Sequence, residues 1–153
     1  MGDSFVDNEG EERIAAMLQR STGNDDPRRL RELLGKVSNL AGEYALSSVV
    51  VGMAGVEGDL VFPEIVDFVV SALRVDDSIV RMTRERSVLF LTDVDQGGAE
   101  EIMDRLLRDF SERFPAASKP PVSLHYFEVT PATRSASLKD VLLALFVAPS
   151  TAH

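Results

Sequence analysis

The run SSVVVGMA at residues 47–54 is rich in small and β-branched side chains, with almost no polar interruption after its first two residues. A strand with one face in water alternates apolar and polar residues. This run does not alternate, which is typical of a buried strand. It is also far shorter than the roughly 20 residues that span a bilayer. The run therefore predicts a buried strand within a folded core rather than a membrane helix.

The segments around this strand alternate between helical and extended patterns. Their order after a short first helix is α-β-α-β-β-α-β-α, and its middle part is a β-α-β-β-α-β unit. This order predicts an α+β fold, ferredoxin-like or nucleotide-cyclase-like, with an antiparallel-centred sheet and helices packed on one face. The predicted elements are helices at 11–20, 27–44, 62–73, 99–114 and 138–147, and strands at 47–54, 79–83, 87–92 and 122–129.

Length and composition limit the organisation of the chain and the function classes open to it. The 153 residues suit one domain at 25–148, preceded by an acidic tail and short amphipathic helix at 1–24 and followed by a tail at 149–153. A helix as short as 11–20 is not stable alone, so we expect it to dock on a neighbour or on a second copy of the chain.

Charge and residue usage exclude several kinds of chemistry. The net charge of -9 disfavours nucleic acid and anionic membranes as partners. The chain has no cysteine and only two histidines, which rules out disulfides and thiolate catalysis and argues against zinc sites and a histidine-based triad. The acidic amino terminus lacks the pattern of a signal peptide, so a cytoplasmic protein is expected.

Four anchors in the sequence carry a resemblance to a known family. They are Asp26-Pro27-Arg28-Arg29, Gly58-Asp59 with the helix up to Leu73-Arg74, the two strand segments 79–82 and 87–91, and the segments 122–124 with 141–146. In this order and spacing the chain resembles the GGDEF family, the diguanylate cyclase domains that make cyclic di-GMP from two GTP molecules. The resemblance covers roughly residues 25–146.

The family's catalytic signature is degenerate in this chain. It would fall on residues 83–87, where both of its glycines are lost and Arg86 replaces the acid that follows Glu85. Gly52 stands where the resemblance places a metal-binding aspartate, and a segment that helps to hold GTP is missing. Because phosphoryl transfer needs metal ions that clamp the phosphates, the resemblance implies a module with no catalytic residue, no bound metal and no cofactor. Glu85 as a metal ligand is the weaker alternative to a solvated ion pair with its neighbouring arginines.

One binding motif of the family is retained. Arg74 and Asp77 form an Arg-x-x-Asp pattern five residues before the degenerate signature, and the resemblance implies an inhibitory site that binds cyclic di-GMP there. A guanidinium can fork onto a guanine edge or a phosphate, and a carboxylate can accept from guanine nitrogens. Arg81 lies close by and adds positive charge. The alternative is that Arg74 and Asp77 only cap and end the preceding helix.

Two functions therefore follow from the sequence. The first is a catalytically inactive, GGDEF-like regulatory module that binds cyclic di-GMP through Arg74, Asp77 and Arg81. The second is a protein-interaction or dimerisation domain with no nucleotide ligand. In either case a protein partner or self-association is expected, because a module without chemistry of its own acts through contacts.

Overall fold

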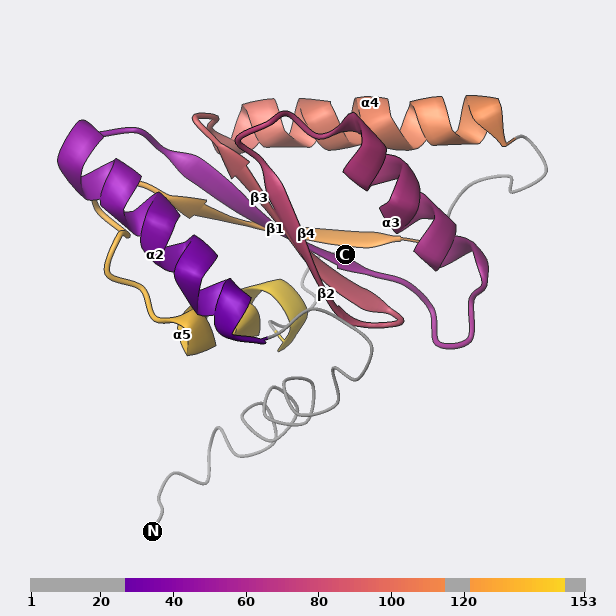
Figure 1. Ribbon diagram of the computed structural model, residues 1–153, viewed down its shortest axis with the longest axis horizontal. Coiled ribbons are helices and arrows are strands. Elements are labelled where there is room, and N and C mark those ends of the chain that lie inside the picture. The colour runs from indigo at the N-terminus through magenta and orange to yellow at the C-terminus, as the bar shows by residue number, and fades with distance from the viewer. Residues whose placement is uncertain (1–26, 115–121, 148–153) are drawn as a thin grey trace, which may run out of the picture.

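The computed structural model describes residues 27–114 and 122–147. The predicted helix at 11–20, both tails and the end of the predicted domain at residue 148 lie outside the described residues. Figure 1 shows a sheet with helices on both sides of it. Within the described ranges, no helix has both the length and the apolar character needed to span a membrane.

The sheet has four strands in the order β2-β3-β1-β4. They are β1 (Ser48–Ala54), β2 (Ser78–Thr83), β3 (Arg86–Thr92) and β4 (Ser123–Val129). Every neighbouring pair is antiparallel, and β1 lies between β3 and β4. This arrangement confirms the predicted α+β fold class with a β-α-β-β-α-β core.

The helices cover both faces of the sheet. On one face lie α3 (Val61–Ala72) and α4 (Gln96–Arg113), the two helices of the β-α-β-β-α-β unit. On the other lie α2 (Pro27–Tyr44), α5 (Leu138–Leu142) and a π-helical turn, η2 (Leu143–Val147). The expectation of helices on one face is therefore right for the central unit and wrong for the whole chain. The reason is β1, whose side chains are buried on both faces, so the sheet needs cover on both sides.

Local patterns explain where the helices begin and what they bury. In α2 the buried side chains recur every three or four residues, which places them on one stripe: Leu30, Leu34, Val37 and Ala41. Helix α4 begins at Gln96 rather than at the predicted Ala99. Asp95 caps the helix by accepting a hydrogen bond from the Gly98 amide at 2.8 Å. Gly97 and Gly98, which precede Ala99, are therefore part of the first turn. The last predicted helix changes to π geometry after Leu142.

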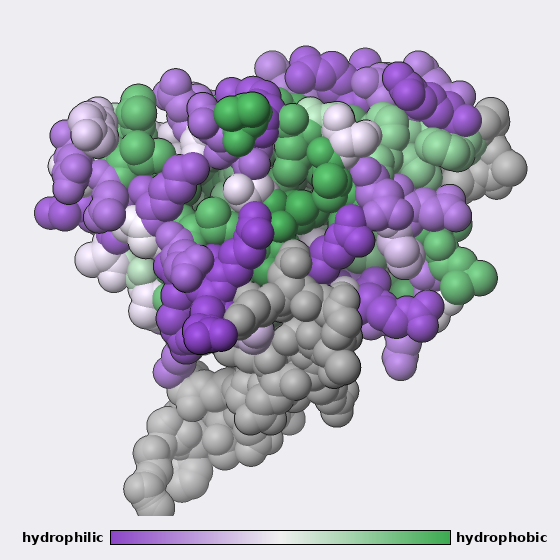
Figure 2. Space-filling view, viewed as in Figure 1, coloured by the Kyte–Doolittle hydropathy of each residue, from purple (hydrophilic) through white to green (hydrophobic). Residues whose placement is uncertain are grey.

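The edge strands differ in what surrounds them. Strand β2 forms one edge of the sheet, and its pairing with β3 is irregular between Arg81 and Thr83. Its side chains alternate, so Val80 and Met82 pack toward α2 while Ile79 and Arg81 lie on the side of α3. Figure 2 shows hydrophobic surface in the middle of the viewed face, between α2 and α3. Strand β2 thus carries apolar contacts to both helix layers.

Tyr126 on the other edge strand, β4, should make stability depend on alkaline pH. Burial, followed by the negative charges of Glu100 and Asp104, raises the pKa of Tyr126 to about 12. An unfolded tyrosine has a pKa near 10. Between about pH 10 and 12 the folded chain keeps a proton that the unfolded chain has lost. Titration of Tyr126 therefore leaves the free energy of unfolding unchanged below pH ~10. Above pH ~10 it lowers this free energy, by at most about 1.4 kcal/mol per pH unit.

Urea midpoints at alkaline and neutral pH check this expectation. The Tyr126→Phe variant has no proton to lose, so its midpoint should fall less than that of the parent chain between neutral pH and about pH 11. Equal falls in the two proteins would contradict the assigned pKa.

Candidate binding site at the two ends of strand β2

Arg74 and Asp77 come together in the turn between α3 and β2. The helix ends at Ala72, and the Asp77 amide donates to the Arg74 carbonyl at 3.0 Å, which closes the turn. The side chains form a two-point ion pair: Nε of Arg74 lies 2.8 Å from Oδ2 of Asp77, and Nη2 lies 2.9 Å from Oδ1. This fork-like geometry is the strong form of an arginine–carboxylate contact.

Asp77 also binds the end of strand β3. Its Oδ1 accepts from the Thr92 amide at 3.1 Å and from the Thr92 hydroxyl at 3.4 Å. Nη2 of Arg74 donates to the Thr92 carbonyl at 2.6 Å. The Asp77 side chain is 3% exposed, whereas that of Arg74 is 52% exposed. The pair therefore joins the α3–β2 turn to β3, with the carboxylate inside and the guanidinium at the surface.

The electrostatics of this pair favour a fixed, charged arginine. Hydrogen bonding to Asp77 raises the pKa of Arg74 above its usual value, opposed by partial burial and supported by the charges of Asp77, Asp76 and Asp93. Beside it, Val75 is 97% exposed. An oriented guanidinium next to a bare apolar side chain is a surface that can contact a ligand or a protein.

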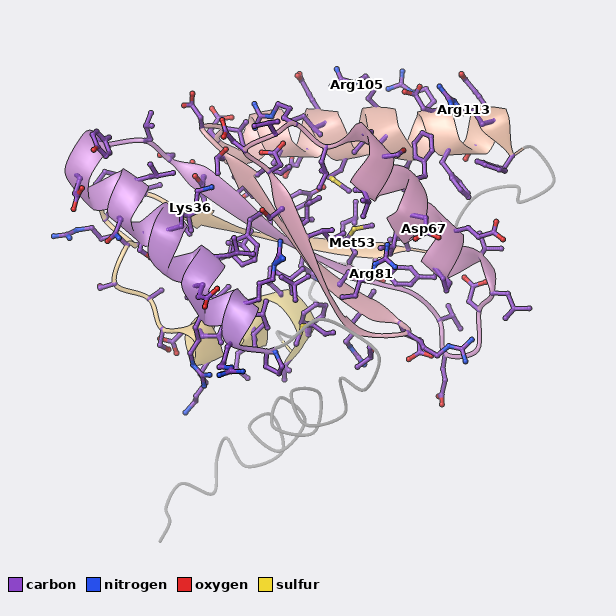
Figure 3. The ribbon with its side chains drawn as sticks, viewed as in Figure 1. Lys36, Met53, Asp67, Arg81, Arg105 and Arg113 are labelled. Carbon is purple, nitrogen blue, oxygen red and sulfur yellow. The ribbon has the colours of Figure 1, made fainter. Side chains whose placement is uncertain are left out.

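Arg81 is not brought to this pair. It lies on β2, four residues beyond Asp77, which is about 13 Å along a strand at about 3.3 Å per residue. Its Nη2 donates to Oδ1 of Asp67 on α3 at 2.7 Å, and Figure 3 shows the two side chains meeting between strand and helix. The three residues predicted from the sequence thus fall into two ion pairs at different places along β2.

The degenerate signature lies at the far end of β2. The predicted three-residue tip is a two-residue turn, Arg84-Glu85, because Arg86 already belongs to β3. The Glu85 amide donates to the Thr83 hydroxyl at 3.2 Å, and its carbonyl accepts from the Gly55 amide at 2.8 Å. The turn is therefore tied to the end of β1.

A cavity of about 250 Å³ opens between this end of β2 and the first turns of α3. Of the residues that line this cavity, the sequence had pointed to Arg81 and not to the hydroxyls or the apolar wall. Alternation along β2 and β3 is the signal that could have found the hydroxyls, since Arg81 is paired with Ser87 across the two strands. The lining residues are Phe62, Pro63, Val66, Arg81, Thr83, Arg84 and Ser87.

Gly52 on β1 is closely covered by the carboxyl-terminal turn η2. A Cβ atom at this position would lie 2.7 Å from Cβ of Leu145 and 3.2 Å from the Phe146 ring. The guanidinium of Arg86 in turn lies over the Phe146 ring at 5.9 Å. Real Cβ atoms essentially never approach another atom as closely as the 2.7 Å to Leu145, so the packing at position 52 requires glycine. In the described ranges, no three His, Asp or Glu side chains gather as ligands for a metal ion.

The layers and strand order together define a GGDEF-like fold, and solved structures agree. The chain is similar to PelD 158-CT from Pseudomonas aeruginosa PAO1, with 17% identity and a TM-score of 0.62 over 78% of this chain and 43% of that one. It is also similar to a DGC protein from Thermotoga maritima, with 16% identity and a TM-score of 0.55 over 76% of this chain and 86% of that one.

A third similar structure is a sensory box/GGDEF family protein from Caulobacter crescentus CB15. It shares 16% identity, with a TM-score of 0.55 over 80% of this chain and 90% of that one. No protein-family model matches the sequence, and neither does any curated protein. The likeness to all three structures is one of fold, so function has to be argued from the residues of this chain.

Proposed function

We propose that this chain is a non-catalytic, GGDEF-like regulatory module that binds cyclic di-GMP at the exposed side of Arg74. The observation that carries the proposal is the two-point contact between Arg74 and Asp77. It holds a guanidinium in one orientation with half of its side chain exposed. Because the orientation is set before a ligand arrives, less conformational entropy is lost on binding.

Two features support the absence of catalysis in this proposal. The position that the resemblance gives to a metal-binding aspartate is Gly52, which Leu145 and Phe146 cover. At the hairpin, Glu85 is flanked by Arg84 and Arg86 rather than by a second acid. Two arginines repel a divalent cation, and metal-assisted phosphoryl transfer depends on holding one.

The chemistry of the exposed guanidinium suits a guanine nucleotide. Arginine donates to O6 and N7 of guanine and to phosphate oxygens. In Arg74 the Nε and Nη2 groups donate to Asp77 and Thr92, so Nη1 is the group that would donate to the nucleotide. The Asp77 oxygens already accept from Arg74 and Thr92, so in this proposal Asp77 is a positioning residue that orients Arg74. Arg81 is directed to Asp67 and is not part of this site.

Titration calorimetry with cyclic di-GMP tests the proposal. We expect the parent chain to bind and Arg74→Ala to lose at least about tenfold in affinity, since the charge-assisted contact made by Nη1 is removed. Arg74→Lys keeps the charge but loses the two-point contact with Asp77 that orients the donor, and should bind almost as weakly. Arg105→Ala, an exposed arginine on α4, is the matched control and should bind like the parent.

Thermal unfolding of each variant separates lost binding from lost structure. A parent chain that gives no heat with cyclic di-GMP at high micromolar concentration would contradict the ligand proposal. So would an Arg74→Ala variant that is folded and binds with unchanged affinity.

The second candidate function is protein contact at the same turn, favoured by the bare side chain of Val75. Val75 is almost fully exposed, and burying it against a partner would remove its apolar surface from water. If this surface mediates self-association, light scattering should show a dimer that Val75→Asp dissociates. A monomer at all concentrations would contradict self-association through Val75.

A further inference from the structure

Strand β4 is an edge of the sheet that lacks the usual features that block an edge. Its pairing with β1 runs over the whole strand without a register shift, whereas the pairing of β2, the other edge strand, is irregular between Arg81 and Thr83. The β4 sequence, SLHYFEV, contains no proline and a single acidic or basic residue, Glu128. Irregular pairing, proline and charged side chains usually keep an edge strand from accepting another strand. Strand β4 is therefore suited to pairing.

The hydrogen bonds of β1 fix the direction of the main-chain groups on β4. Successive residues of an antiparallel strand direct their amide and carbonyl groups alternately to one neighbouring strand and to the other. Just after β1, the Gly55 amide donates to the Glu85 carbonyl on the β3 side at 2.8 Å. Three residues earlier, Gly52 therefore faces β4, where its partner is His125. The main-chain groups of His125 are thus directed to β1.

Leu124 and Tyr126 lie on either side of His125, so their main-chain groups point away from β1 to the outer side of the sheet. Glu128 agrees with this alternation, because its carbonyl accepts from the hydroxyl of Thr133 at 2.8 Å, outside the sheet. Within the described residues, none of the main-chain hydrogen bonds outside helices and strand pairs involves Leu124 or Tyr126. Their amides and carbonyls form a row of donors and acceptors along the edge.

The rim of this edge on the α4 side is acidic. Leu124 and Tyr126 pack in the apolar layer under α4, and alternation along the strand places Glu128 on the same face. Burial raises the pKa of Tyr126, and so do the negative charges of Glu100 and Asp104 on the neighbouring side of α4. These two residues are one turn apart and share one side of the helix. Three carboxylates therefore border the edge.

We propose that the outer edge of β4 binds an extended, basic segment of a partner protein, which joins the sheet as a further strand. The main-chain groups of Leu124 and Tyr126 form the hydrogen bonds that hold the added strand. Alternate side chains of that strand lie on the α4 face of the sheet, where lysine or arginine meets Glu100, Asp104 and Glu128.

The charges favour such a partner over this chain itself. If two copies paired antiparallel through β4, their acidic rims would meet on the same face of the joined sheet, and each copy has a net charge of -9. Segment 1–26 is acidic as well, and segment 148–153 contains no lysine or arginine. Segment 115–121, PAASKPP, is rich in proline, which has no amide to donate. The added strand is therefore assigned to another protein.

This edge shares no residue with the turn that holds Arg74. Binding at β4 needs neither Arg74 nor Asp77, so either proposal can fail while the other holds.

The peptide acetyl-KVKVKVK-amide is the probe, titrated into the full chain at low ionic strength and followed by NMR. We expect it to bind and to slow hydrogen exchange at the Leu124 and Tyr126 amides, because these amides gain acceptors. Acetyl-KVKPKVK-amide has the same charges, but its proline interrupts the strand, so it should bind at least about fivefold more weakly. Equal affinity for the two peptides, or unchanged exchange at both amides, would overturn the proposal.

Variants of α4 test the acidic rim. Glu100→Gln combined with Asp104→Asn should weaken acetyl-KVKVKVK-amide by about threefold or more, since two charge contacts are lost. Glu101→Gln combined with Glu112→Gln makes the same change of charge on the side of α4 away from the sheet and should bind like the parent. All four side chains are exposed, so both variants should keep the fold, which their NMR spectra report.

Two further results would contradict the proposal. One is an unchanged affinity when Glu100 and Asp104 are replaced. The other is a dimer, seen by light scattering, in which the Leu124 and Tyr126 amides are protected without any peptide, because a second copy would then occupy the edge.

Discussion

Replacing Gly52 by aspartate is expected to lower the free energy of unfolding by roughly 3–5 kcal/mol and to create no metal site. The new Cβ would lie 2.7 Å from Cβ of Leu145, so η2 must move. Overpacking of this kind costs about 1–3 kcal/mol, and a carboxylate placed among Leu145 and Phe146 adds the cost of burying an unpaired polar group. The substitution restores a residue type without the space that residue needs.

Urea unfolding of the parent, Gly52→Ala and Gly52→Asp measures this effect. Gly52→Ala carries the steric part alone and should lose about 1–3 kcal/mol, less than the aspartate variant. Titration with Mn²⁺, followed by relaxation of water protons, tests for a metal site. A Gly52→Asp chain as stable as the parent, or one that binds Mn²⁺ where the parent does not, would show that η2 does not cover this position.

Asp77→Ala is expected to lower the free energy of unfolding by about 2–4 kcal/mol. Removal of the carboxylate leaves the Thr92 amide without its acceptor, and Thr92 is only 7% exposed. The Thr92 hydroxyl keeps only the Asp76 carbonyl, at 3.5 Å. An unsatisfied buried donor costs about 1–3 kcal/mol. The ion pair with Arg74 adds less, because the half-exposed guanidinium can turn to water when its partner is gone.

Neighbouring Asp76 provides the matched control. It is exposed, and although its carbonyl lies 3.5 Å from the Thr92 hydroxyl, the Asp76→Ala change removes only the side chain. That variant should lose less than about 0.5 kcal/mol. Asp77→Asn keeps one acceptor oxygen and should fall between the two. If Asp77→Ala were no less stable than Asp76→Ala, the turn would not depend on the buried carboxylate.

These two predictions concern residues that the sequence analysis had already singled out, but for different reasons. Gly52 was noted because it stands where the resemblance places a metal-binding aspartate, and Asp77 was noted as a ligand-binding residue. In the structure Gly52 is where the carboxyl-terminal turn packs on the sheet, and Asp77 is a buried acceptor for the end of β3. Neither role is visible in the sequence, because each depends on a partner far away in the chain.

The order of the elements along the chain was predictable because each element carries its own local signal. These signals are the continuous β-branched run of β1, the amphipathic stripe of α2 and the polar tip between β2 and β3, and each can be seen within a few neighbouring residues. Element limits were less predictable. The Asp95 cap places the start of α4 three residues before its apolar stripe, at Gln96, and nothing in 138–147 marks the change to π geometry at Leu143.

The amino-acid sequence alone determined the α+β class, the order of the elements and the three-residue spacing of Arg74 and Asp77. Only the tertiary structure decided that helices cover both faces of the sheet and that Arg81 faces Asp67 rather than Arg74. It also decided that two arginines, two hydroxyls and an apolar wall meet in one cavity. The physical reason is range: local patterns act over a few residues, whereas these contacts form only when α3, the hairpin and η2 pack on the sheet and exclude water.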